Sequence, residues 1–162
     1  MIQNRQRPDW DEYFMEIANA AAKRATCDRG YSGCVITREK QILVTGYVGS
    51  PAGLPHCDEI GHKIKTVTHE DGHQSQHCQR TAHAEANAIC QAAKIGTSVN
   101  KGTLYCKMTP CAACAKMIIN SGIVRVVCDK RYHEGQETEE LFKTANIELK
   151  YFDGKLEHYD KQ

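Results

Sequence analysis

Hydrophobic and polar positions divide the chain into patterned segments at both ends and an unpatterned stretch between them. In residues 9–25 (DWDEYFMEIANAAAKRA), apolar residues recur at helical spacing and Asp9 with Glu12 forms an N-cap signature, so we expect an amphipathic helix. Two strand-like runs follow, GCVIT (33–37) and QILVTGYV (41–48). The short charged turn between them predicts a β-hairpin.

From residue 84 onward, helical and strand-like patterns alternate. This alternation predicts parallel crossover connections, and the whole pattern predicts an α/β fold, a three-layer α/β/α sandwich around a mixed sheet of about five strands. The segments are a helix at 84–96, a strand at 102–107, a helix at 111–122, a strand at 123–129, a helix at 138–146 and a strand at 147–152.

Residues 49–80 contain Gly, Pro, His and charged residues with almost no apolar periodicity, which predicts a long loop without regular structure. Such loops are unusual inside compact domains, and they commonly serve a function or are organised by a metal. The chain has no repeats and no linker-like segment, so we expect one domain over residues 1–162.

The composition narrows the class of protein. Hydrophobic residues make up 41% of the 162 residues, and 21 Lys and Arg nearly balance 20 Asp and Glu, so nothing indicates a surface for a nucleic acid polymer. No stretch approaches the roughly 18 apolar residues of a membrane span. The first residues also lack the apolar core of a secretion signal, so we expect a cytoplasmic protein without a membrane partner.

Cysteine and histidine are unusually abundant. Nine cysteines in a protein expected to keep its thiols reduced favour metal binding or catalysis over a disulfide framework. Six of the eight histidines lie between His56 and His83. Four cysteines within strand-like or helical segments are expected to be core residues, namely Cys34, Cys90, Cys106 and Cys128.

The motif with the clearest chemistry joins His83-Ala84-Glu85 to Pro110-Cys111-Ala112-Ala113-Cys114. One His and two Cys are three zinc ligands, which leaves the fourth tetrahedral position open, as in catalytic zinc sites. Glu85 can face that opening as a proton carrier. A redox Cys-x-x-Cys pair would leave His83 and Glu85 unexplained, and a structural zinc would need a fourth ligand.

His-x-Glu with Pro-Cys-x-x-Cys is the pattern of the zinc-dependent nucleobase deaminases. Over about residues 10–152 the chain resembles, more specifically, the deoxycytidylate (dCMP) deaminases of bacteria and their phages. The stretches that carry the resemblance are RATCDR (24–29), GYVGSPAGLPHCDE (46–59), HCQRTAHAEANAI (77–89), GTLYCKMTPCAACAKMIINSGI (102–123) and ELFKTANIEL (140–149).

The resemblance implies a cytidine deaminase-like fold and zinc-dependent hydrolysis of dCMP to dUMP and ammonia, which supplies dUMP for dTMP synthesis. If a phage encodes the chain, its compartment is the host-cell cytoplasm. Alternatives are a deaminase of free (deoxy)cytidine or of another cytosine or adenine substrate, and a catalytically silent nucleotide-binding zinc protein. Glu85 argues against the silent protein. Val48 argues for it, because the family usually has an Asn there that commonly contacts the sugar 3′-hydroxyl.

The resemblance also implies roles for individual residues of the catalytic site. His83, Cys111 and Cys114 would hold Zn²⁺, and Glu85 would carry the proton. The backbone of Ala84 would touch the base.

Further substrate contacts are implied around this centre. Asn87 is a candidate for a substrate or effector contact. Tyr132 and Arg29 are the candidates for the phosphate, with Arg131 and His133 as alternatives.

Similar proteins often carry a second, structural zinc that ties the first helix to the long loop. Cys27 and Cys57 match positions used there, and we expect His73 and Cys78 to complete the site, with His77 as the alternative to His73. A structural zinc would explain how a loop with so few apolar residues becomes ordered.

Finally, the resemblance implies regulation. dCTP would activate and dTTP would inhibit through a triphosphate site that also takes Mg²⁺, in a homohexamer. The residues expected at this allosteric site are Gly49, Gly53, Asp58, Glu59 and Lys94.

Overall fold

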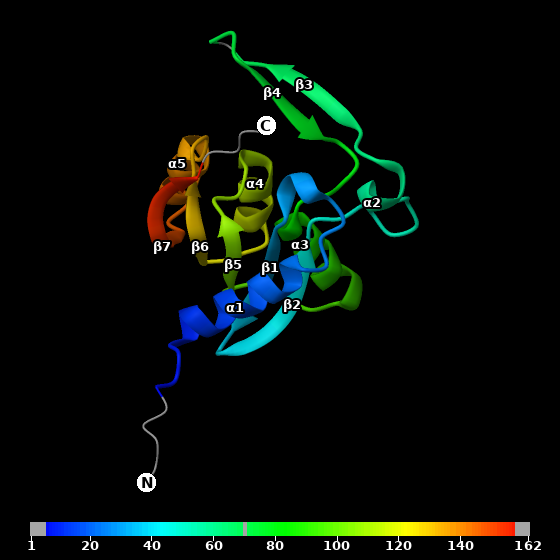
Figure 1. Ribbon diagram of the computed structural model, residues 1–162. Helices are drawn as coiled ribbons and strands as arrows, with labels where there is room; N and C mark the ends of the chain where they lie inside the picture. The colour runs from blue at the N-terminus through cyan, green and yellow to red at the C-terminus, as the bar shows by residue number, and fades with distance from the viewer. Residues whose placement is uncertain (1–5, 70, 158–162) are drawn as a thin grey trace.

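A computed structural model describes residues 6–69 and 71–157 of the chain (Figure 1). No helix of this described part is long and apolar enough to cross a membrane. The elements in chain order are α1 (Trp10–Ala22), the 3₁₀ turn η1 (Asp28–Gly30), β1 (Gly33–Arg38), β2 (Gln41–Tyr47), α2 (Cys57–Ile60), β3 (Ile64–Thr68), β4 (Gln74–Cys78), α3 (Ala84–Ile95), β5 (Thr103–Met108), α4 (Ala112–Asn120), β6 (Arg125–Tyr132), α5 (Gln136–Thr144) and β7 (Glu148–Glu157).

Five strands form one mixed sheet in the order β2-β1-β5-β6-β7. β1 pairs antiparallel with β2 and with β5, whereas β5, β6 and β7 run parallel. The predicted hairpin and the predicted parallel crossovers are therefore confirmed. Because β5 and β6 are parallel, the segments that follow them leave from the same edge of the sheet.

Helices cover both faces of this sheet, which confirms the predicted three-layer sandwich. On one face α1 packs against the central strands through Phe14, Met15, Ala18, Val35, Tyr105 and Val127. The residues that alternate with these along the strands point to the other face. There they pack with α3, α4 and α5 in one core that includes Cys34, Ile36, Leu104, Cys106, Val126, Cys128, Ala88, Ile118 and Phe142.

The prediction that residues 49–80 lack regular structure is wrong. They contain the short helix α2 and an antiparallel hairpin, β3–β4, which pairs Ile64 with Cys78 and Thr68 with Gln74. We call this hairpin the arm, and Figure 1 shows it extending beyond the main sheet. Most arm side chains are exposed on both faces, so the alternation that reveals a half-buried strand is missing.

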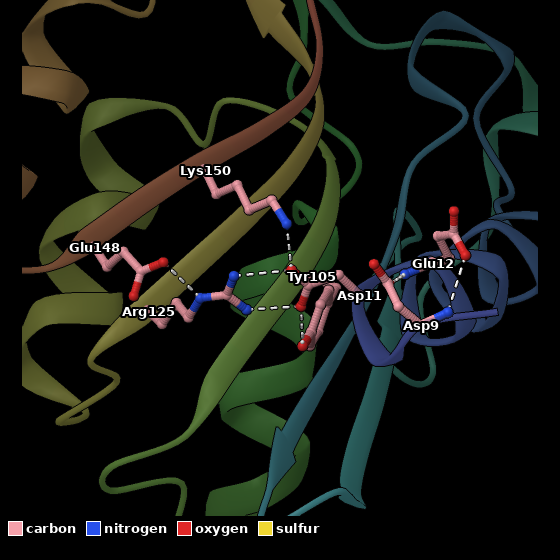
Figure 2. Close-up of polar contacts among 7 residues, drawn as sticks. All are labelled: Asp9, Asp11, Glu12, Tyr105, Arg125, Glu148 and Lys150. Carbon is pink, nitrogen blue, oxygen red and sulfur yellow. Dashed lines mark hydrogen bonds and ion pairs between the residues drawn. The ribbon is translucent and has the colours of Figure 1, made fainter.

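A cluster of charged groups fixes α1 to the sheet (Figure 2). Arg125 of β6 donates to both carboxylate oxygens of Asp11 at 2.7 and 2.8 Å, and Lys150 of β7 donates to one of them at 2.7 Å. The hydroxyl of Tyr105 donates to the same carboxylate at 2.9 Å. These bonds, that from Arg125 above all, hold the pKa of Asp11 well below its usual range despite the opposing effect of burial.

Candidate active site and metal centres

Two helix N-termini bring the predicted catalytic ligands together. His83 is the N-cap of α3 and Cys111 the N-cap of α4, with Cys114 in the first turn of α4. Nδ1 of His83 lies 3.4 Å from Sγ of Cys111 and 3.5 Å from Sγ of Cys114. Tetrahedral N and S ligands of one zinc ion are roughly 3.5 Å apart, given Zn–N of about 2.0 Å and Zn–S of about 2.3 Å. The three side chains therefore fit zinc.

The electrostatics of this cluster favour a bound cation. The pKa of the Cys111 thiol is lowered to about 3, first by its hydrogen bond with Cys114 and then by its hydrogen bond with His83. The same contact with Cys111 raises the pKa of His83 to about 9. The lowered pKa of Cys111 favours its thiolate, which is the form of cysteine that binds a metal, whereas His83 binds a metal as the neutral imidazole.

Glu85 lies two residues beyond His83, in the first turn of α3, and lines the same cavity as His83 and Cys111. Only 6% of the residue is exposed. Burial raises the pKa of its carboxyl group, because a charged carboxylate is poorly solvated there. A carboxyl group beside the open zinc position with a raised pKa can both accept and donate a proton.

Close packing against the sheet positions the start of α3. A Cβ atom on Gly46 of β2 would overlap the backbone of Ala84 and Ala88, so this position requires glycine for α3 to lie where it does. The thiol of Cys34 in β1 also donates to the carbonyl oxygen of Ala84 at 3.2 Å. Both contacts come from strands under the helix that carries Glu85.

A cavity of about 320 Å³ opens at this centre. Arg29 and Tyr132, both predicted to contact the phosphate, line it, and so does Val48. The arm forms another part of the wall through Gln76 and His77.

Other predicted substrate residues are placed differently. The side-chain amide of Asn87 donates to the carbonyl oxygen of Tyr47 at 2.8 Å, and Asn87 does not line the cavity. Its contact with a substrate or an effector remains a prediction. Arg131 pairs with Glu139 through two hydrogen bonds of 2.6 and 2.7 Å, also away from the cavity. Neither His133 nor the buried Ala84 lines it, and the predicted backbone contact of Ala84 remains a prediction.

A second cluster joins η1, α2 and the arm. Donor atoms of Cys27, Cys57, His62 and Cys78 all lie within 4.8 Å of one another. Nδ1 of His62 is 3.6 Å from Sγ of Cys27, and the Sγ atoms of Cys57 and Cys78 are 3.6 Å apart. Four such ligands make the closed set of a structural zinc site, in which S atoms lie roughly 3.8 Å apart.

Burial and hydrogen bonding shift the pKa values of the three thiols of the second cluster in different directions. Burial opposes ionisation of Cys78, but hydrogen bonds from backbone N–H groups, that of Arg80 first, lower the pKa of its thiol to about 6. Burial raises the pKa of Cys57 to about 12, and it also raises the pKa of Cys27. Nε2 of His62 pairs with Asp28 at 2.9 Å, and such a carboxylate commonly fixes the ring of a metal ligand.

The prediction of His73 as the fourth ligand is therefore corrected to His62. His73 lies at the far end of the arm, where its ring nitrogens contact Asp71 and Glu134. His77, the alternative, points its Nε2 at the hydroxyl of Ser75 at 2.7 Å. The signal that identifies His62 is its place just after α2, five residues from Cys57.

The predicted allosteric residues lie on the surface around α2 and at the end of α3. Asp58 and Glu59 are exposed on α2, and Lys94 is exposed in the last turn of α3. Gly53 has a φ of 85° with open space around it. Gly49 instead forms a bridge with Ala82. Of the four cysteines predicted to lie in the core, three are buried, but Cys90 is exposed.

Comparisons with known proteins agree with this geometry. The family model of the cytidine and deoxycytidylate deaminase zinc-binding region matches residues 8–130. A deoxycytidylate deaminase of Mycobacterium phage D29 is 39% identical over 126 residues, 76% of this chain and 97% of the phage protein. A deoxycytidylate deaminase of Schizosaccharomyces pombe is 36% identical over 92% of this chain, which spans 46% of that longer protein.

A solved structure shares the fold. The dCMP deaminase of cyanophage S-TIM5, in complex with dCMP and dUMP, superimposes with a TM-score of 0.72 over 91% of this chain and 100% of that one, at 23% identity. The match of the family model to most of the chain, together with the phage relative, shows that this chain belongs to the cytidine and deoxycytidylate deaminase family.

Proposed function

We propose that the chain catalyses the hydrolytic deamination of dCMP to dUMP and ammonia. The observation that carries the proposal is the cluster of three zinc ligands, two of which line one cavity together with Glu85 and Arg29. The names of the phage and yeast relatives, and the dCMP and dUMP bound to the cyanophage enzyme, support dCMP as the substrate.

The residues divide the chemistry between them. Zinc, when bound, supplies the Lewis acidity that makes water a nucleophile near neutral pH. Glu85 takes a proton from the attacking water and delivers it to N3 of the cytosine ring. It then takes the remaining proton of that water from the new hydroxyl group on C4 and passes it to the amino group. The amino group leaves C4 as ammonia, so that water and cytosine become uracil and ammonia. Its buried position keeps competing water away from this proton.

Arg29 and Tyr132 are the proposed phosphate contacts, since both line the cavity and a guanidinium can hold two phosphate oxygens at once. The guanidinium of Arg29 also donates to the carbonyl oxygen of Gln76 at 3.0 Å, which fixes its place beside the arm. Val48 also lies in the wall of the cavity, but its side chain is apolar and cannot donate a hydrogen bond to the substrate. The residue is 7% exposed.

We extend the proposal to regulation by dCTP and dTTP with Mg²⁺, and to a hexameric assembly. Its support is the resemblance of residues 46–59 to the effector loop of dCMP deaminases, together with the exposure of Asp58 and Glu59 on α2. Activation by dCTP, inhibition by dTTP and a hexamer in native mass spectrometry are the expected results. A monomer that responds to neither nucleotide would remove this part and leave the catalytic proposal intact.

The test of the substrate is ultraviolet-monitored deamination of dCMP and of deoxycytidine by the zinc-loaded protein. We expect dCMP to be strongly preferred. Arg29→Ala should lower kcat/KM for dCMP by about 10- to 100-fold, the value of a charged hydrogen bond, and should change turnover of deoxycytidine little. Arg24→Ala removes an exposed Arg that does not line the cavity, so it is the matched control. Preference for deoxycytidine would overturn the proposal.

A further inference from the structure

The arm crosses the wall of the cavity and is held at both ends. Near its base, Cys78 belongs to the second zinc cluster. Between the ends, Gln76 and His77 line the cavity. At the tip, His73 contacts Glu134, which lies in the segment between β6 and α5.

The tip carries a third group of metal-ligating side chains. Donor atoms of His69, His73 and Glu134 all lie within 4.8 Å of one another, although Glu134 is 61 residues from His73 in the chain. Nε2 of His73 is 3.3 Å from Oε1 of Glu134. Nitrogen and oxygen ligands of one tetrahedral ion lie roughly 3.4 Å apart, so these two atoms already have the spacing of ligands.

A second observation comes from the other nitrogen of His73. Its Nδ1 contacts Oδ1 of Asp71 at 2.5 Å. His62, in the second zinc cluster, has the same arrangement, with one ring nitrogen on Asp28 and the other facing Cys27. A carboxylate behind a His is the common way in which proteins orient a metal-binding imidazole.

We propose that His69, His73 and Glu134 form a third metal site, which takes an exchangeable divalent transition-metal ion of the zinc and cobalt class. Imidazole and carboxylate ligands suit such ions, and the side chain of His73 is 48% exposed, so the ion can enter and leave. The rings of His69 and His73 are stacked, with planes within 5°. His69 must therefore turn out of the stack and exchange its hydrogen bond to Ser75 for the ion.

The site connects metal binding to the cavity. Glu134 lines the cavity, and its other oxygen accepts a hydrogen bond from the hydroxyl of Tyr132 at 3.1 Å. An ion that holds Glu134 and His73 together fixes the tip of the arm to the segment that carries Tyr132.

The test is a titration of the zinc-loaded protein with Co²⁺, followed by visible absorption and calorimetry, with elemental analysis to confirm that both zinc ions stay bound. We expect one further equivalent to bind, with the d–d absorption of nitrogen and oxygen ligands and without the thiolate charge-transfer absorption of a cysteine site. His73→Ala should weaken this binding at least tenfold. Asp71→Asn should weaken it about 10- to 100-fold, as loss of an orienting carboxylate does.

Gln74→Ala is the matched control, because Gln74 is the exposed first residue of β4, next to His73, and is not one of the three ligands. It should bind Co²⁺ as the wild type does. The proposal would be overturned if no Co²⁺ bound in addition to the two zinc ions, or if His73→Ala bound Co²⁺ as tightly as the wild type. Thiolate absorption from the bound Co²⁺ would also overturn it. None of these measurements depends on turnover, so they stand apart from the proposed deaminase activity.

Discussion

At the scale of single residues, the catalytic chemistry depends on where a helix begins. His83 has extended backbone angles as the N-cap of α3, whereas Glu85 already lies in the helix. Two residues are therefore enough to place a ligand and a proton carrier on the same cavity in different directions. Cys111 and Cys114 repeat this arrangement at the start of α4.

Replacement of Glu85 by Gln tests this division of roles. The amide keeps the shape of the side chain but cannot move a proton, so we expect kcat for dCMP to fall about 10²- to 10⁴-fold. Zinc content should not change, since Glu85 is not among the clustered ligands. Kinetics and elemental analysis of the same preparation check both points, and a loss of zinc would show that Glu85 acts through the metal site instead.

Distance along the chain explains which site residues could be identified from the sequence. The spacing of His83, Glu85, Cys111 and Cys114 is local to two helix starts, so the sequence was sufficient to group them. Asn87 differs, because its amide contacts the carbonyl groups of Tyr47 and Gly49, which only the fold brings near.

At the scale of elements, residues 49–80 contribute little to the hydrophobic core, and three of their side chains belong to the second cluster of possible metal ligands. Most side chains of the arm are exposed, including the apolar Ile64, and only Ser75 is buried, so the arm packs little apolar surface. This is why the sequence of the arm lacks the hydrophobic alternation that predicts β-strands. It is also why the choice between His62, His73 and His77 as the fourth ligand could not be made before the course of the arm was known.

The corrected ligand can be tested by elemental analysis. His62→Ala should lose the second zinc ion and unfold at a temperature lower by roughly 5–10 °C, because the metal holds the base of the arm. His77→Ala removes a neighbouring imidazole outside the cluster, and it should keep both ions. If His77→Ala rather than His62→Ala loses the ion, the ligand set is wrong.

At the scale of the whole molecule, the topology of the sheet decides where the site forms. The parallel strands β5 and β6 end side by side, so Cys111 after β5 and Glu134 after β6 meet at one edge. The helix α1 lies on the opposite face from α3 and α4. Asp11 anchors it to strands that are more than 100 residues away in the chain.

This anchor makes stability depend on pH. At neutral pH, Asp11→Asn should lower the free energy of unfolding by about 2–4 kcal/mol, because it leaves Arg125 and Lys150 with a neutral partner in a partly buried place. The control Glu148→Gln removes the more exposed partner of Arg125 and should cost less than about 1 kcal/mol.

The pKa of Asp11 is lowered in the folded state, so its stabilising contribution is complete above the unfolded pKa of about 4 and is lost as the pH falls below it. Urea unfolding of wild type and variant, compared at each pH, cancels the protonation of the metal ligands that both share. The difference between them should shrink from pH 7 to pH 3. A constant difference would mean that Asp11 stabilises α1 through packing and not through its charge.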